Sequence, residues 1–256
     1  MFPLPALTTH ISGKLDQPAL VVLHAIGTDA RLWTKQADHL DSVRRIIAVE
    51  FPGHGGSPLP DGNETIERYA DYVIHTLDQM GVREFDLLGL SLGGMVAVAL
   101  TLAHPERVRR LIICDTRLDV PEQYYAMWDL LVEMAQTQGM DTVADFMVKR
   151  WFGDGKRAEN PQIDEIREQL RQTSVNGFVT AARAIQKLDL LPQVGKLNVP
   201  TLFLVGSEDG ALPDLMSHMH GEVADSQLAV LPDAGHLSNV DQAQAFTQAV
   251  RDFLTR

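Results

Sequence analysis

A serine flanked by glycines is the first candidate for chemistry in this sequence. Ser91 lies within residues 89–93, Gly-Leu-Ser-Leu-Gly, which follow an apolar run at 85–88 and precede a second one at 94–100. This order predicts a strand, a tight turn and a helix, in which a strained backbone lifts the serine hydroxyl out of the sheet. Glycine suits the flanking positions because a Cβ would collide with the neighbouring strand and helix. Ser91 is therefore a candidate nucleophile.

An aspartate and a histidine follow two later predicted strands. Asp209 comes after the apolar run 201–206, and His236 comes after the run 228–231. The carboxyl ends of parallel strands meet at one edge of a sheet, so the three loops would converge there. The chain order Ser, Asp, His is that of the α/β-hydrolase arrangement, in which histidine is the general base and aspartate orients it. The sequence therefore predicts a catalytic triad.

Asp115 is the competing acid. It follows the predicted strand 111–114, at a place where some α/β-hydrolases carry the acid of their triad. Because Asp209 follows a later strand and precedes His236, we assign the acid to Asp209 and keep Asp115 as the alternative.

Cleavage of an ester through an acyl-enzyme also needs hydrogen-bond donors for the oxyanion. One is the backbone N–H of Leu92, at the start of a predicted helix whose dipole favours negative charge. The second is expected in the loop 24–29, where we assign the backbone N–H of Ile26.

Four histidines are not assigned to catalysis. His24 is predicted to brace its loop by hydrogen bonds, and His54 to be part of a glycine-rich turn at 51–57. His218 and His220 have no carboxylate or thiolate set nearby and make a poor metal site. We expect neither a metal nor an organic cofactor.

Short apolar runs alternate with helical patterns along most of the chain. Runs at 19–23 and 45–49 predict strands with a helix at 31–40 between them, and the spacing of apolar residues over 66–80 predicts an amphipathic helix. Such alternation predicts an α/β fold, with a mostly parallel sheet and helices on both faces.

The alternation breaks in the middle of the chain, where the pattern is helical throughout. We predict a helical cap at 120–191 inserted into an α/β-hydrolase core formed by 1–119 and 192–256. An aromatic stripe in such a cap is more often packed core than substrate wall, so the aromatic residues of its first helix receive no binding role.

Composition agrees with a globular enzyme. The 256 residues are 45% hydrophobic and 22% charged, and the net charge of −12 disfavours nucleic acid or an anionic membrane as partner. The single cysteine, Cys114, cannot form an internal disulfide, and the N-terminal residues show no leader pattern, so we expect a cytoplasmic protein. The sequence leaves open whether the chain forms a homo-oligomer.

Several segments resemble the 3-oxoadipate enol-lactonase family of α/β-hydrolases, from about residue 18 to the C-terminus. The segments are 27–29 with Trp33, 89–96, 104–108, 150–152 and 235–240. The serine turn and the His-Pro-Glu-Arg-Val segment occur across many α/β-hydrolases. The Arg-Trp-Phe and His-Leu-Ser-Asn-Val segments point more specifically to the enol-lactonase group. The resemblance implies a nucleophilic Ser91, a His236 oriented by Asp209, and a small lactone substrate that bears a carboxylate.

The chain departs from the family pattern at three positions. Ala25 replaces a common glycine, and Glu50 and Pro52 stand where the family often has an aspartate and an arginine. Pro52 removes a cation that could bind a substrate carboxylate. The remaining candidates are Arg31, Arg117, Lys149 and Arg150. Arg150, beside Trp151, is the one expected to reach the pocket, and we assign both residues to substrate binding.

The predicted function is that of a serine hydrolase acting on a small carboxylic ester or lactone, of the 3-oxoadipate enol-lactone type. Alternatives are a general carboxylesterase, a hydrolase of carbon–carbon bonds in vinylogous diketones, and a cofactor-free perhydrolase. A receptor that keeps the fold and captures a ligand is the alternative outside enzymes.

Overall fold

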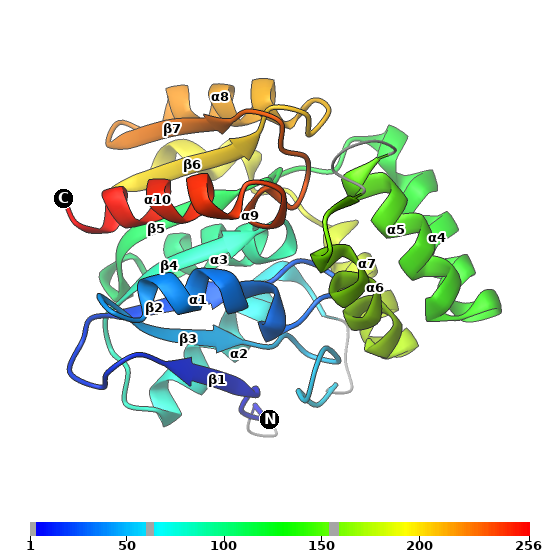
Figure 1. The fold of residues 1–256 in the computed structure, drawn as a ribbon, viewed down its shortest axis with the longest axis horizontal. Helices are drawn as coiled ribbons and strands as arrows, with labels where there is room; N and C mark the ends of the chain where they lie inside the picture. The colour runs from blue at the N-terminus through cyan, green and yellow to red at the C-terminus, as the bar shows by residue number, and fades with distance from the viewer. Residues whose placement is uncertain (1–3, 60–63, 154–158) are drawn as a thin grey trace.

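A single sheet forms the centre of the molecule. The computed structural model describes residues 4–59, 64–153 and 159–256. The strands are β1 (Thr9–Ser12), β2 (Ala19–Leu23), β3 (Arg45–Val49), β4 (Phe85–Leu90), β5 (Val108–Cys114), β6 (Thr201–Gly206) and β7 (Ser226–Leu231). Their order in the sheet is β1-β3-β2-β4-β5-β6-β7 (Figure 1). Only β1 is antiparallel to its neighbour, which confirms the predicted mostly parallel sheet.

Helices cover both faces of the sheet. In Figure 1, α1 (Thr34–Leu40) and α10 (Ala243–Leu254) lie in front of it, and α2 (Ile66–Gln79), α3 (Leu92–Ala103) and α8 (Leu212–Glu222) lie behind it. With both faces covered, β2, β4 and β6 are buried along their whole length, which is why they are continuous apolar runs in the sequence. No helix within the described residues is long and apolar enough to cross a membrane.

Two elements differ from the sequence prediction. The helix expected at 31–40 is a 3₁₀ turn, Ala30–Trp33, followed by α1, because the Asp29 side chain accepts a hydrogen bond from the Arg31 N–H and begins the turn early. β1 was not predicted, because its four residues include no apolar run and none of them is fully buried. The remaining short helices are Pro105–Arg107, Glu122–Tyr124, Leu191–Lys196 and α9 (Ser238–Asp241).

The helical segment predicted in the middle of the chain is present. It consists of α4 (Tyr125–Gln138), α5 (Met140–Phe152), α6 (Gln162–Gln172) and α7 (Val175–Ile185), inserted between β5 and β6. Figure 1 shows it beyond the carboxyl ends of the parallel strands, on the right of the sheet. The division of the chain into core and cap at 120–191 stays a prediction.

Close backbone contacts join this insert to the sheet edge. A Cβ on Gly53, where φ is +73°, would lie 2.5 Å from the Cα of Gly177 in α7. The Thr173 hydroxyl donates to the carbonyl oxygen of Gly27 at 3.0 Å, and the Ser174 hydroxyl donates to that of Gly53 at 3.1 Å. The insert is therefore bonded to the loops that follow β2 and β3.

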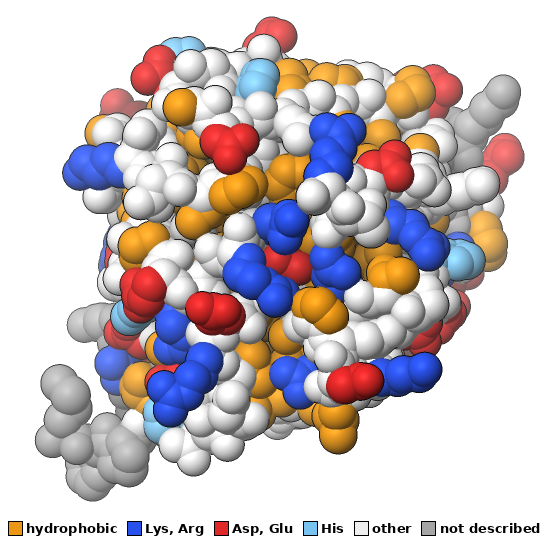
Figure 2. Space-filling view, turned by 90° about the vertical axis from the view of Figure 1, so that its left-hand side faces the viewer, with side chains coloured by type: hydrophobic (Ala, Val, Ile, Leu, Met, Phe, Trp, Pro, Cys, Tyr) orange, Lys and Arg blue, Asp and Glu red, His pale blue; other side chains and the backbone are white. Residues whose placement is uncertain are grey.

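Arginines gather at the opposite edge of the sheet. The Asp86 carboxylate is buried and faces the guanidinium groups of Arg44, Arg109 and Arg110, with the closest N–O distance 3.0 Å to Arg44. Figure 2, which views the left-hand side of Figure 1, shows basic side chains gathered there. Asp86 compensates the charge of Arg44, whose side chain is only 10% exposed.

Replacement of Asp86 tests how much this ion cluster stabilises the fold. We expect Asp86→Ala to lower the free energy of unfolding by about 3–5 kcal/mol, because it leaves a buried guanidinium without its counter-charge. The control is Asp78→Ala, which removes a 55% exposed partner of Arg107 and should cost less than about 1 kcal/mol. Urea denaturation measures the free energy of unfolding of both variants. Equal losses of stability would contradict a stabilising role for the buried Asp86 ion cluster.

Candidate active site

Ser91 occupies a strained turn between β4 and α3. Its φ and ψ angles are 55° and −116°, a backbone conformation that residues with a side chain rarely adopt. A Cβ on Gly89 would lie 2.1 Å from the carbonyl oxygen of Gly93, and a Cβ on Gly93 would lie 2.1 Å from that of Leu23. The predicted reason for the two glycines is therefore confirmed, since helix and strand approach too closely for any side chain.

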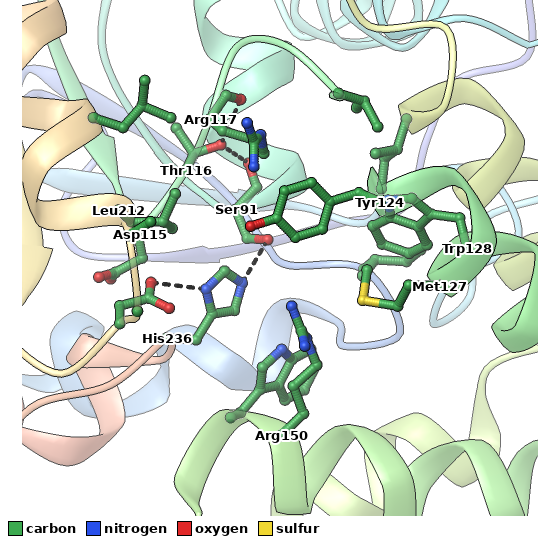
Figure 3. Close-up of a pocket in the computed structure, with 18 of the residues that line it drawn as sticks. Ser91, Asp115, Thr116, Arg117, Tyr124, Met127, Trp128, Arg150, Leu212 and His236 are labelled. Carbon is green, nitrogen blue, oxygen red and sulfur yellow. Dashed lines mark hydrogen bonds and ion pairs between the residues drawn. The ribbon is translucent and has the colours of Figure 1, made fainter. Parts of the chain in front are cut away.

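The three residues of the predicted triad lie together at the carboxyl edge of the sheet. The Ser91 Oγ is 2.9 Å from the His236 Nε2, and the His236 Nδ1 is 2.9 Å from the Asp209 Oδ2 (Figure 3). Asp209 follows β6 and His236 follows β7, as expected from the sequence. The arrangement gives a hydroxyl, a base in hydrogen-bond contact with it, and a carboxylate that fixes the tautomer of the base.

The surroundings of His236 favour its protonated form. Burial acts to lower the pKa of His236, but the charge and hydrogen bond of Asp209 outweigh it, so that the pKa is raised above the ordinary 6.5. The ring of Trp151 stacks beside the imidazole with centroids 6.0 Å apart. An imidazolium that forms when Ser91 loses its proton would be stabilised in this site.

Asp115 lies next to the triad but bonds to other groups. Its Oδ1 accepts a hydrogen bond from the Gly206 N–H at 2.8 Å, and its Oδ2 accepts one from the Ser238 hydroxyl. Burial and the charge of Asp209 raise the pKa of Asp115 to about 8. Asp115 thus joins the end of β6 to the segment after His236, while Asp209 is the carboxylate that contacts the imidazole.

The two residues predicted to supply oxyanion donors both lie near Ser91. Leu92 is the first residue of α3, directly after Ser91, and Ile26 lines the same cavity as Ser91. Within the described parts of the chain, neither backbone N–H donates a hydrogen bond to another group of the protein. Both are therefore available to a substrate oxygen, and their assignment stays a prediction.

His24 braces its loop by hydrogen bonds, as predicted, and His54 donates from its Nδ1 to the carbonyl oxygen of Pro52 at 3.0 Å. The His24 Nε2 accepts a hydrogen bond from the Phe51 N–H at 2.9 Å, while its Nδ1 donates to the carbonyl oxygen of Ala25 at 2.7 Å. Burial lowers the pKa of His24 to about 3 and that of His54 to about 4, so both imidazoles are neutral. The loop that carries Ile26 is held in place by this contact between its first residue and the chain after β3.

A cavity of about 480 Å³ opens over Ser91. Its lining includes the triad, Ile26, Arg150 and Trp151, which the sequence had placed there, and also Arg117. The sequence analysis did not identify the cavity-lining residues in and near α4 and α8. These residues are Thr116, Val120, Gln123, Tyr124, Met127, Trp128, Leu131, Leu212 and Leu215.

The four candidate cations differ in their surroundings. Arg31 pairs with Asp29 at 2.6 Å and lies outside this cavity, and Lys149 is not among its lining residues. Arg117 lines the cavity but pairs with Asp119 at 2.8 Å. Arg150 lines it and forms no ion pair with any residue that the structure describes.

The fold and the site together define a known family. Residues 18–243 match the model of the alpha/beta hydrolase fold family, and the chain belongs to that family. It is 29% identical over 253 residues to 3-oxoadipate enol-lactonase 2 of Acinetobacter baylyi, covering 98% of this chain and 94% of the relative.

Two solved structures are similar over nearly their full length. The enol-lactonase from Burkholderia xenovorans LB400 superposes with a TM-score of 0.92 at 31% identity, covering 98% of this chain and 96% of that one. A thermophilic esterase from Thermogutta terrifontis superposes with a TM-score of 0.90 at 30% identity, covering 97% of this chain and 93% of the esterase. The relatives thus include both lactonases and esterases.

Removal of each carboxylate in turn tests which one is the acid. We expect Asp209→Asn to lower kcat by about 10⁴-fold, because the amide stabilises the wrong tautomer of His236. Asp115→Asn should lower kcat less than about tenfold, because an amide can still accept from Gly206 and bond to Ser238. Ester turnover by both variants gives the comparison, and a larger loss in Asp115→Asn would move the acid to that residue.

The raised pKa of His236 predicts the pH profile. The general base must be neutral, so kcat/KM should fall as the pH drops through the pKa of His236, with a midpoint above 6.5. In Asp209→Asn the residual activity should have a lower midpoint, since the attracting charge is gone. Both midpoints can be measured from initial rates between about pH 5 and pH 9, which spans the range in which histidine titrates. A wild-type midpoint below that of Asp209→Asn would contradict this account.

Proposed function

We propose that the protein is a serine hydrolase that cleaves carboxylic esters or lactones through an acyl-enzyme, without a metal or organic cofactor. The observation that carries the proposal is the continuous hydrogen-bonded line from Ser91 through His236 to Asp209, at 2.9 Å for each contact, beneath a cavity of about 480 Å³. Its membership of the α/β-hydrolase family supports the same reaction class.

The geometry suggests a role for each group. His236 takes the proton of Ser91 as the hydroxyl oxygen attacks the ester carbonyl, and Asp209 holds the imidazolium that results. The N–H groups of Ile26 and Leu92 stabilise the oxyanion. His236 then donates the proton to the leaving alkoxide and activates a water molecule, which hydrolyses the acyl-enzyme.

Within this class, a lactone that carries a carboxylate is the more specific candidate. The similarity to enol-lactonases supports it, and so does Arg150, a guanidinium on the cavity wall that forms no ion pair with any described residue. A carboxylate enclosed in the cavity would need such a counter-charge. The absence of an arginine at position 52 and the similarity to an esterase favour a general carboxylesterase as the second candidate.

Ser91→Ala tests the reaction class. It deletes one hydroxyl without loss of core volume, so the protein should fold while kcat falls by about 10⁴-fold or more. The release of 4-nitrophenol from 4-nitrophenyl acetate measures turnover, and circular dichroism measures folding. Retention of a tenth of the wild-type rate by a folded variant would exclude Ser91 as the nucleophile.

Arg150→Gln tests the substrate carboxylate. We expect the wild-type protein to hydrolyse a carboxylate-bearing lactone with at least tenfold higher kcat/KM than the methyl ester of that lactone, and Arg150→Gln to abolish the difference. Lys149→Gln is the matched control, because it removes a neighbouring charge on α5 that does not line the cavity. Equal kcat/KM for the two substrates on the wild type would instead indicate a general esterase.

A further inference from the structure

One wall of the cavity is apolar and has no role in the chemistry described above. It is formed by Met127, Trp128 and Leu131 of α4, together with Val120 and Ile185. Leu131 is fully buried, whereas Met127 and Trp128 are partly exposed and pack against the hydrophobic core. All three side chains line the cavity, so a ligand bound there would contact apolar surface.

The charged groups of the cavity lie elsewhere. In Figure 3, Asp115 and Leu212 lie to one side of Ser91, and Met127 and Trp128 lie to the other. Arg117 is neutralised by Asp119, and its guanidinium covers the ring of Tyr124 with 4.6 Å to the centroid. Among the described residues, those that α4 itself contributes to the lining, Met127, Trp128 and Leu131, carry no charge.

The cavity is larger than the reacting group requires. Its volume of about 480 Å³ lies in the range, roughly 300–1,000 Å³, of cavities that enclose whole drug-sized ligands. A small ester or lactone at Ser91 would occupy only part of such a cavity. Each methylene group of a ligand that becomes fully buried against this wall should raise the binding constant about fourfold.

We infer that the substrate bears, beside its ester or lactone group, an apolar substituent of about six carbons or more that lies against Met127, Trp128 and Leu131. The inference rests on the proposed function, because it concerns the occupant of the same site. It predicts a substrate larger than a short-chain ester, with its apolar end on α4.

Two series of esters test the inference on the wild-type protein. The first is 4-nitrophenyl esters with acyl chains from acetyl to octanoyl, and the second is alkyl acetates from methyl to octyl. We expect kcat/KM to rise at least tenfold with chain length in one of them, which also identifies the side of the ester that meets α4. Hydrolysis that is independent of length in both series would overturn the inference and leave the proposed function intact. No hydrolysis of any ester would count against the proposed function itself.

A variant pair then locates the substituent. Met127→Trp fills the cavity beside α4, and we expect it to lower kcat/KM at least tenfold for the preferred long-chain ester but less than threefold for the short one. The matched control is Leu130→Trp, which adds the same ring at a neighbouring position that is 48% exposed and does not line the cavity. It should change neither rate. Equal losses on both esters in a folded Met127→Trp protein would contradict the placement. If that variant does not fold, the length dependence on the wild type still decides.

Discussion

The close approach of α3 to the sheet is the constraint on which the site depends. The first turn of α3 lies against the end of β2 so tightly that a Cβ on Gly93 would overlap the carbonyl oxygen of Leu23. This contact sets the Ser91 hydroxyl at the carboxyl edge of the sheet and brings the N-terminus of α3 beside the loop that carries Ile26. Backbone packing thereby sets the Ser91 hydroxyl, which we propose as the nucleophile, near the two backbone N–H groups that we propose as oxyanion donors.

Two carboxyl groups with different hydrogen-bond partners lie near His236. Asp209 bonds to the imidazole, whereas Asp115 is enclosed by Gly206 and Ser238 and has a raised pKa. In a buried site the negative charge of Asp209 disfavours a second one on Asp115, which together with burial raises the pKa of Asp115. The same carboxyl group joins the acid loop to the histidine loop, so the distance between Asp209 and His236 depends on it in part.

The sequence contained enough information to predict the sheet and the meeting of Ser91, Asp209 and His236 at its edge. Strands such as β4 and β6 are buried on both faces and therefore appear as unbroken apolar runs, and Ser91 and Asp209 each follow one of them. His236 follows the edge strand β7, which is only partly buried but still contains the apolar run 228–231. β1 could not be predicted, because two of its four residues are exposed. The walls of the cavity could not be predicted either. In α4 the adjacent residues Leu130 and Leu131 are both leucine, yet one is 48% exposed and the other is buried, and only the packing of the insert distinguishes them.

Covalent labelling of the nucleophile is the most direct test of the central claim. The protein would be treated with an activated phosphonate ester, which phosphonylates a serine that is paired with a general base, and its peptides would be analysed by mass spectrometry. We predict a single adduct on Ser91, absent from Ser91→Ala, formed at the same rate at which ester hydrolysis is lost. An adduct on a different residue, or unlabelled protein that loses its activity, would contradict the account.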